Sequence, residues 1–154
     1  MSNALEELKR FQTDRLLHKQ EFDVEVATIN ILEELFEIHG VRDNKDRQFA
    51  KEAYRAMKEQ INELYTRKLY GKSMNGFEYN TPTEYDKVDG FCDIQNFAGG
   101  EVYKLGYDNE LSLLEMAKEV NSRKGEIVNG KFEKYKTEEA KALWYTADYS
   151  LCKL

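Results

Sequence analysis

Five carboxylates stand out because they lie within otherwise apolar stretches of the chain. Three of them, Glu33, Glu34 and Glu37, form one group, and Asp89 and Asp93 form a second. Residues three or four apart share a face of a helix, so Glu34 points the same way as Glu37, and Asp89 the same way as Asp93. Close carboxylates repel one another unless a cation lies between them, and oxygen ligands suit Mg²⁺ or Mn²⁺. The spacing therefore predicts a metal site of the kind used in phosphate chemistry.

The apolar neighbours of these acids favour a site over an ordinary solvated helix face. Acidic residues on a helix usually point into water, and this is the alternative interpretation of the glutamates. Here the polar strip is narrow, because Leu35 and Phe36 separate the glutamates. Asp93 lies between Phe91 and Ile94 in a strongly apolar segment. A carboxylate in such a segment needs a partner. We therefore expect the two acidic helices to lie side by side, with their carboxylates facing one cleft.

The elements that would position these acids are predicted to be helices. The chain has 154 residues, 41% hydrophobic and 34% charged, with 9 Gly and only 1 Pro, which is typical of a helical domain. Apolar residues recur at helical spacing. Helices are expected over residues 3–18, 23–39, 43–70, 81–105 and 108–121, and in a short terminal segment after Thr137 that contains Leu143 and Trp144. Residues 72–80 are expected to form a loop, and residues 125–136 an irregular or hairpin arm.

The fold class is therefore all-α, a bundle of five or six helices in a single domain over residues 1–154. The fourth helix is expected to begin with Thr81 as the cap, Pro82 at its first position and Glu84 completing a capping box. Its apolar residues are expected to point into the core. These are Val88, Phe91, Ile94, Phe97, Ala98 and Val102, and the fifth helix is expected to bury Leu111, Leu114 and Val120.

Charge and targeting signals exclude several classes of function. The formal charge of −6 argues against a general nucleic-acid binder, which needs a basic face. No apolar run approaches the ~20 residues that span a bilayer, and the first residues do not resemble a signal peptide. Two cysteines, Cys92 and Cys152, are too few for a disulfide framework. We therefore expect a cytoplasmic protein without a membrane partner.

The acidic groups carry a resemblance to a known superfamily. The pattern Glu33-Glu34-x-x-Glu37, followed by a helix that contains Asp89 and Asp93, resembles the all-α NTP pyrophosphohydrolases. This is the MazG-like and phosphoribosyl-ATP pyrophosphohydrolase-like superfamily, and the similarity spans about residues 21–134, including a basic arm after Gly130. The usual second motif is Glu-x-x-Asp, whereas this chain has Gly90 at the glutamate position and offers Asp89 one residue earlier. This Asp-x-x-x-Asp spacing is similar to that of phage-type members.

The resemblance implies a chemistry and assigns roles to the matching residues. It implies Mg²⁺-dependent cleavage of a nucleoside triphosphate into a monophosphate and pyrophosphate, with Mn²⁺ as a substitute for Mg²⁺, by a dimer or tetramer. The implied metal ligands are Glu34, Glu37, Asp89 and Asp93, and Glu33 or Glu37 would orient the attacking water. The implied substrate-binding residues are Asn96, Lys118, Asn121, Arg123, Lys124 and Lys131. For each cation, a solvated helix end is an equally good interpretation.

Two other functions fit parts of the sequence. A non-catalytic helical protein could present its acidic face to a basic partner, and it would not respond to Mg²⁺. A di-iron carboxylate bundle needs Glu-x-x-His on two helices. The residues three positions before His18 and His39 are Arg15 and Phe36, so this second alternative fails.

Overall fold

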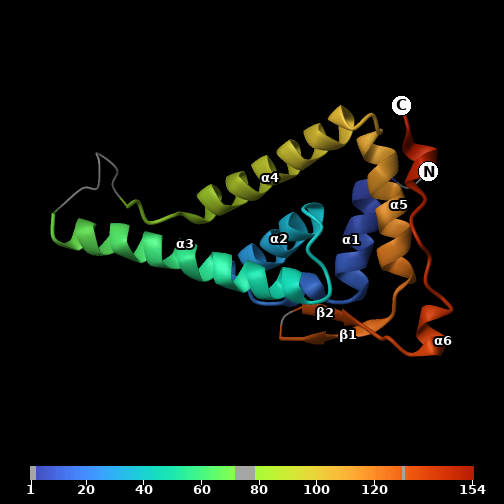
Figure 1. Ribbon diagram of the computed structural model, residues 1–154, viewed down its shortest axis with the longest axis horizontal. Helices are drawn as coiled ribbons and strands as arrows, with labels where there is room; N and C mark the ends of the chain where they lie inside the picture. Colours follow the sequence, from blue (N-terminus) through green and yellow to red (C-terminus); the bar gives the residue numbers. More distant parts are fainter. Residues whose placement is uncertain (1–2, 72–78, 130) are drawn as a thin grey trace. The chain divides into compact units, whose positions relative to one another are not determined.

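The computed structural model describes residues 3–71, 79–129 and 131–154, and most of them are helical (Figure 1). The chain divides into two compact units. Unit 1 comprises Met1–Gln20 and Thr83–Leu154, and unit 2 comprises Glu21–Pro82. The helices are α1 (Ala4–Asp14), α2 (Val24–Ile38), α3 (Lys45–Leu69), α4 (Glu84–Lys104), α5 (Asn109–Ser122) and α6 (Glu138–Lys141), with short 3₁₀ turns at Leu17–Lys19 and Tyr149–Cys152. The prediction of an all-α fold is confirmed.

Unit 2 is a pair of packed helices, α2 and α3 (Figure 1). The Asp23 side chain caps α2 by accepting hydrogen bonds from the backbone N–H groups of the first turn. After α2 the chain turns at Gly40, whose φ of 84° is accessible to glycine without strain. Among the described residues of this unit, Ile29 and Ala50 are the buried hydrophobic ones, and the rings of Phe36 and Phe49 meet edge to face. This packing holds the second half of α2 against the start of α3.

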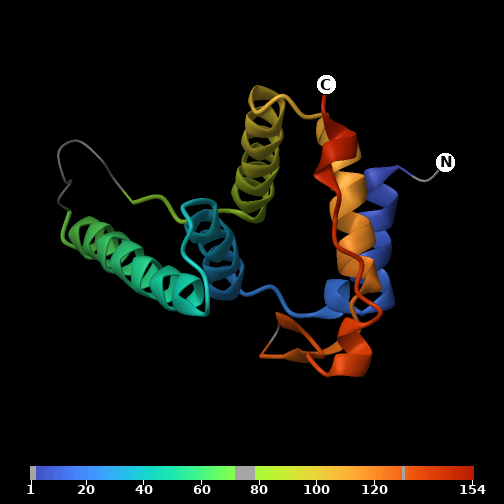
Figure 2. The ribbon, with the colours of Figure 1, turned by 45° about the vertical axis from the view of Figure 1, so that its right-hand side comes forward.

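Unit 1 has its core between α1 and α5, which lie side by side in both views (Figures 1 and 2). Ala4 on α1 and Ala117 on α5 are buried, and their small side chains let the two helices approach closely. Asp108 caps α5, since its side chain accepts a hydrogen bond from the Leu111 backbone N–H. The last residues of the chain return to α5, and Cys152 is buried there.

The predicted arm is a β-hairpin. Strands β1 (Gly125–Val128) and β2 (Lys131–Lys134) are antiparallel, with Gly125 opposite Lys134 and Val128 opposite Lys131. A side chain at position 125 would collide with the backbone of Glu133, so glycine permits this close pairing. Gly130, which the sequence places in this arm, lies outside the described residues.

The predicted start of α4 is wrong by two residues. The cap is Thr83 rather than Thr81, and Asp86 rather than Glu84 completes the capping box. The Asp86 carboxylate accepts hydrogen bonds from the Thr83 backbone N–H at 2.7 Å and from its hydroxyl at 2.8 Å. These bonds lower the pKa of Asp86, the backbone bond most of all. Each side chain of this pair accepts a hydrogen bond from the backbone N–H of the other residue, and these two N–H groups have no partner within the helix. The pair therefore fixes where α4 begins.

Two helices also end earlier than predicted. The first stops at Asp14, because Leu16 adopts a left-handed conformation with φ 55° and breaks the α-helical ladder. The terminal helix ends at Lys141, so Leu143 and Trp144 lie beyond it. The predicted loop over residues 72–80 falls mostly outside the described residues, which resume at Tyr79. The boundaries of α2, α3 and α5 agree with the prediction to within one or two residues.

The prediction of buried apolar residues on α4 is wrong. No residue of α4 is buried, and Val88 and Phe97 are 56% and 69% exposed. On α5, Leu111 is also exposed, and Leu114 and Val120 are half-buried. Helical periodicity identifies an apolar face, but it does not say what covers that face. None of the described helices is both long enough and apolar enough to cross a membrane.

Candidate metal centre

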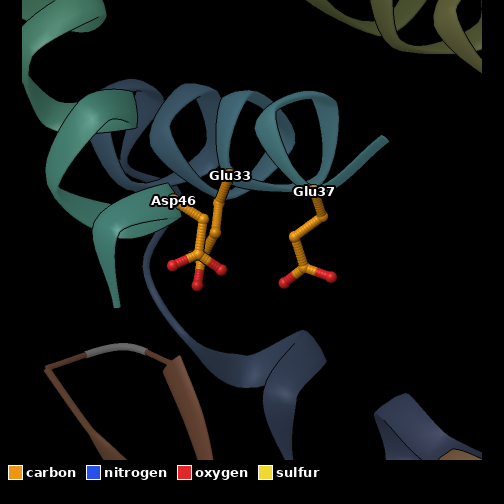
Figure 3. Close-up of side chains that lie close together, drawn as sticks. All are labelled: Glu33, Glu37 and Asp46. Carbon is orange, nitrogen blue, oxygen red and sulfur yellow. The ribbon is translucent and has the colours of Figure 1, made fainter. Parts of the chain in front are cut away.

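Three carboxylates of unit 2 converge where α2 meets the start of α3. Glu33 and Glu37 are four residues apart, so they share the face of α2 that looks toward Asp46 in the first turn of α3 (Figure 3). One carboxylate oxygen from each residue lies within 4.8 Å of the oxygens of the other two. Asp46 is 7% exposed, and the two glutamates are half-buried.

The donor set of these three residues suits a hard divalent cation. Mg²⁺ binds oxygen ligands in octahedral geometry at about 2.1 Å, which places the ligand oxygens about 3 to 4 Å apart. The spacing of the three carboxylates comes close to that range. Three protein oxygens would leave the other octahedral positions to water or phosphate oxygens. Burial supports the same interpretation, since close carboxylates that are partly removed from water need a counter-charge.

Two arginines supply positive charge to this group. The Arg47 guanidinium donates to the Glu33 carboxylate at 2.8 Å and to the Asn30 side-chain oxygen at 2.6 Å. Arg42 donates to Glu37 at 2.6 Å. The three acids and the two arginines therefore form one mixed cluster of carboxylate and guanidinium groups. Such a cluster suits either a metal centre or a network of ion pairs.

The sequence predicted two members of this group and missed the third. Glu37 was predicted as a ligand, and Glu33 as the residue that orients water. Asp46 was not predicted, because an acid in the first turn of a helix is common and is explained by the helix dipole alone. Glu34, the other predicted ligand on α2, is exposed and is not a member of the group formed by the described residues.

The predicted ligands Asp89 and Asp93 lie on α4, in unit 1, and both are exposed. Asn96, a predicted substrate-binding residue, lies three residues after Asp93 and therefore on the same face of α4. Asn96 also lines a groove of about 740 Å³ within unit 1, whose walls come from α1, α4 and α5. The gathering of all four predicted carboxylates around one metal remains a prediction.

Two predicted phosphate-binding cations, Lys118 on α5 and Arg123 at its C-terminal cap, have carboxylate partners on α5. Lys118 donates to Glu115, and Arg123 donates to Glu119. The second oxygen of each carboxylate binds the C-terminal segment. The Glu115 oxygen accepts from the Tyr145 hydroxyl at 2.5 Å and from the Asp148 backbone N–H at 3.2 Å. The Glu119 oxygen accepts from the backbone N–H of residue 147 at 2.8 Å.

These bonds change the acidity of the groups involved. Hydrogen bonds from Lys118, Tyr145 and the Asp148 backbone lower the pKa of Glu115 to about 2. The same bonds raise the pKa of the Lys118 ammonium and of the Tyr145 hydroxyl. Glu115 is only 4% exposed, so its carboxylate depends on these donors to replace water. The sequence shows only the spacing of the acids and bases along α5, and gives no sign of the contact with the C-terminal segment.

Asn121, another predicted substrate-binding residue, joins α5 to α1. Its side-chain oxygen accepts from Arg15 at 3.5 Å, and its amide nitrogen donates to the Glu7 carbonyl at 3.4 Å. Arg15 also donates to the carbonyls of Val120, Asn121 and Arg123, the last at 2.8 Å. The guanidinium lies 4.2 Å from the centre of the Phe11 ring. Arg15 therefore caps the C-terminal end of α5, where orphan carbonyls favour a cation.

The remaining predicted cations lie at and beyond this end of α5. Lys124 is exposed, and its carbonyl accepts a backbone hydrogen bond from Tyr135 at 2.8 Å. Lys131 begins β2 and is half-buried. Together with Arg123 they form a basic segment that leads from α5 into the hairpin. Comparison of the chain with protein-family models, with curated proteins and with solved structures finds no match in any of the three.

Proposed function

We propose that the protein is a Mg²⁺-dependent nucleoside triphosphate pyrophosphohydrolase that releases a nucleoside monophosphate and pyrophosphate. The observation that carries this proposal is the convergence of Glu33, Glu37 and Asp46 on one side of the α2–α3 pair. The resemblance of the acidic motifs to the all-α pyrophosphohydrolases supports the reaction type. Asp89 and Asp93 are proposed as further ligands on the strength of that resemblance.

The residues of unit 2 have distinct roles in this proposal. Glu33, Glu37 and Asp46 would hold the Mg²⁺ or Mn²⁺ ion, with Glu34 beside them on α2. When bound, such an ion neutralises phosphate oxygens and lowers the pKa of a coordinated water. Glu33 or Glu37 would accept a hydrogen bond from the attacking water and orient it toward the α-phosphorus.

The resemblance also assigns the binding of the leaving pyrophosphate to basic residues that lie in unit 1. Lys124 and Lys131 would contribute positive charge, and Lys118 and Arg123 would do so by exchanging a carboxylate partner for phosphate oxygens. Asn96 and Asn121 would donate hydrogen bonds to the ribose or to phosphate oxygens. For Asn121 this requires its bonds to Arg15 and Glu7 to open.

Lys118→Ala should weaken binding of the triphosphate without affecting binding of the metal. The Lys118 side chain is 57% exposed and can reach a phosphate by releasing Glu115, whereas the proposed metal-binding carboxylates are on other helices. We expect KM for the triphosphate to rise about two- to fivefold, with kcat little changed, since a single exposed charge pair contributes little binding energy. Steady-state kinetics with a Mg²⁺ titration measures both quantities. An increase in the half-saturating Mg²⁺ concentration with unchanged KM would argue against this role.

A non-catalytic helical interaction protein is the second candidate. The ion pairs of Arg47 with Glu33 and of Arg42 with Glu37 favour it, because they supply counter-charge without a metal. Thermal unfolding with and without millimolar Mg²⁺ or Mn²⁺ separates the two candidates. A ligand that binds the native state raises its stability by mass action. The enzyme should show a saturable increase in Tm, with Ca²⁺ and added NaCl as controls, and the interaction protein should show none.

We also propose that the active form is a cytoplasmic dimer or tetramer. Ile94, Phe97 and Leu105 share one face of α4 and its C-terminal cap and are 44%, 69% and 76% exposed, and exposed apolar faces commonly serve association. The closed symmetry usual for homo-oligomers allows one such face to pair with its copy. Sedimentation velocity over a range of protein concentrations should show a species of at least twice the chain mass of 18.1 kDa. A monomer at every concentration would contradict the proposed assembly.

A further inference from the structure

We propose that Arg47 is an internal counter-ion that competes with the divalent cation for the Glu33 carboxylate. The inference rests on the metal site of the proposed function and assigns a regulatory role to a residue outside the ligand set. In the metal-free state, the guanidinium holds the acidic group together. When the cation binds, it takes over the Glu33 oxygen and Arg47 must move away.

The side-chain contacts of Arg47 place its charge against the Glu33 carboxylate. One terminal nitrogen, Nη1, bonds both to Glu33 Oε2 at 2.8 Å and to Asn30 Oδ1 at 2.6 Å. The backbone N–H of Arg47 donates to the Asp46 carboxylate at 2.9 Å, so the same residue touches two of the three acids. A cation held at this distance from a ligand oxygen repels a second cation at that oxygen.

Burial makes this pair different from the other arginine pair of the cluster. The side chains of Arg47 and Glu33 are 26% and 13% exposed, whereas those of Arg42 and Glu37 are 61% and 33% exposed. Water and salt screen exposed charges much more than partly buried ones. The chain therefore contains a matched comparison, with two arginines on two acids of one group and similar bond lengths but different solvent access.

Removing Arg47 should raise the affinity for the cation and lower the stability of the metal-free chain. Without Arg47, the cation no longer displaces a guanidinium, so its affinity rises. The metal-free chain loses the counter-charge of a half-buried carboxylate, so its stability falls. Added metal then stabilises the variant more than the wild type, because the increase in stability depends on the ratio of metal concentration to Kd. A purely structural ion pair would produce the loss of stability alone.

The test measures Mn²⁺ and Mg²⁺ affinity of the full chain by calorimetry, and Tm across a metal titration. Arg47→Gln should lower the Kd for Mn²⁺ about tenfold or more and lower the metal-free Tm. Arg42→Gln, the control, should change the Kd less than about fivefold. Arg47→Lys keeps the charge and should bind metal nearly as the wild type does. Asn30→Ala leaves every charge in place but removes one anchor of Arg47, and should lower the Kd about threefold even if Arg47→Gln does not fold.

The outcomes separate this inference from the proposed function. Suppose that the wild type binds metal, but the affinity is unchanged or weaker in Arg47→Gln and Asn30→Ala. Then Arg47 does not compete with the cation, and the proposed metal site is retained. If Arg47→Gln binds metal more tightly but no form of the chain hydrolyses a nucleoside triphosphate, the competition stands and the proposed enzyme is wrong. If no form responds to either metal, both are wrong.

Discussion

Glu37→Gln should abolish Mg²⁺-dependent hydrolysis of nucleoside triphosphates while the chain stays folded. The substitution removes a charged ligand oxygen, and it also relieves repulsion from Glu33 and Asp46 in the metal-free site. Its ion pair with Arg42 is largely exposed, so losing that pair costs little stability. We expect the rate to fall by more than about a hundredfold, since loss of an outer-shell partner of a metal ligand already costs 10- to 100-fold. The rate is measured as the formation of monophosphate and pyrophosphate at saturating Mg²⁺. Far-UV circular dichroism with a thermal scan checks that the variant is folded.

Glu25→Gln is the matched control for this experiment. Glu25 lies on the same helix, its side chain is 49% exposed, and its partner is Lys58 rather than another acid. The control should keep wild-type activity and metal affinity. If Glu37→Gln keeps more than about a tenth of the wild-type rate, Glu37 is not a ligand of the catalytic metal.

The same assay tests the predicted ligands of α4. Asp93→Asn should lose activity as Glu37→Gln does, because the resemblance makes Asp93 the best match to the second acidic motif. Asp89→Asn tests the shifted spacing of that motif. Full activity and unchanged Mn²⁺ affinity in Asp89→Asn would leave Asp93 as the sole acid of α4 that continues the motif.

Glu115→Gln should lower the free energy of unfolding of unit 1 at neutral pH. It should also make that free energy fall less steeply than in the wild type as the pH is lowered. The folded pKa of Glu115 is about 2, below the ordinary value of 4.5. A group with a depressed pKa contributes stability that is fully present above its unfolded pKa and is lost as the pH falls through the folded pKa. The contribution of Glu115 should therefore be complete above about pH 4.5 and disappear between about pH 4.5 and pH 2. The neutral amide of Gln has no such titration.

Urea unfolding of the wild type and of Glu115→Gln at pH 7, 4.5 and 3 measures this difference. The gap in unfolding free energy between the two proteins should be largest at pH 7 and narrow as the pH falls below about 4.5. Glu110→Gln, an exposed change in the first turn of the same helix, should follow the wild type throughout. A gap that stays constant from pH 7 to pH 3 would show that the Glu115 carboxylate does not titrate with a depressed pKa.

The helical architecture could be predicted from the sequence because it depends on local signals. Apolar residues at helical spacing place α2 and α5 to within two residues. The start of α4 was harder to place, because Thr81 and Thr83 are both plausible caps and only reciprocal bonding with Asp86 decides between them. The short α-helix before Trp144 shows the same limitation, since a good cap begins a helix but does not set its length.

The candidate site depended on contacts that the sequence does not display. The pairing of Glu33 and Glu37 follows from helix geometry, but Asp46 joins them only because of the turn between α2 and α3. Two of the partners of Glu115, Tyr145 and Asp148, lie 30 and 33 residues further along the chain. Such contacts are set by tertiary packing, which residue spacing alone cannot reveal. The apolar face of α4 is the converse case, since its periodicity is clear and its burial was wrongly predicted.

The most direct test of the proposed function is a panel of canonical and modified nucleoside triphosphates incubated with the purified protein and Mg²⁺. The products are separated by anion-exchange chromatography, and pyrophosphate is measured by a coupled assay without added phosphatase. Cleavage between the α- and β-phosphates should give monophosphate and pyrophosphate in equal amounts, require Mg²⁺ or Mn²⁺, and disappear in Glu37→Gln. Formation of diphosphate and orthophosphate, or no turnover of any nucleotide by a protein that remains folded, would contradict the proposed function.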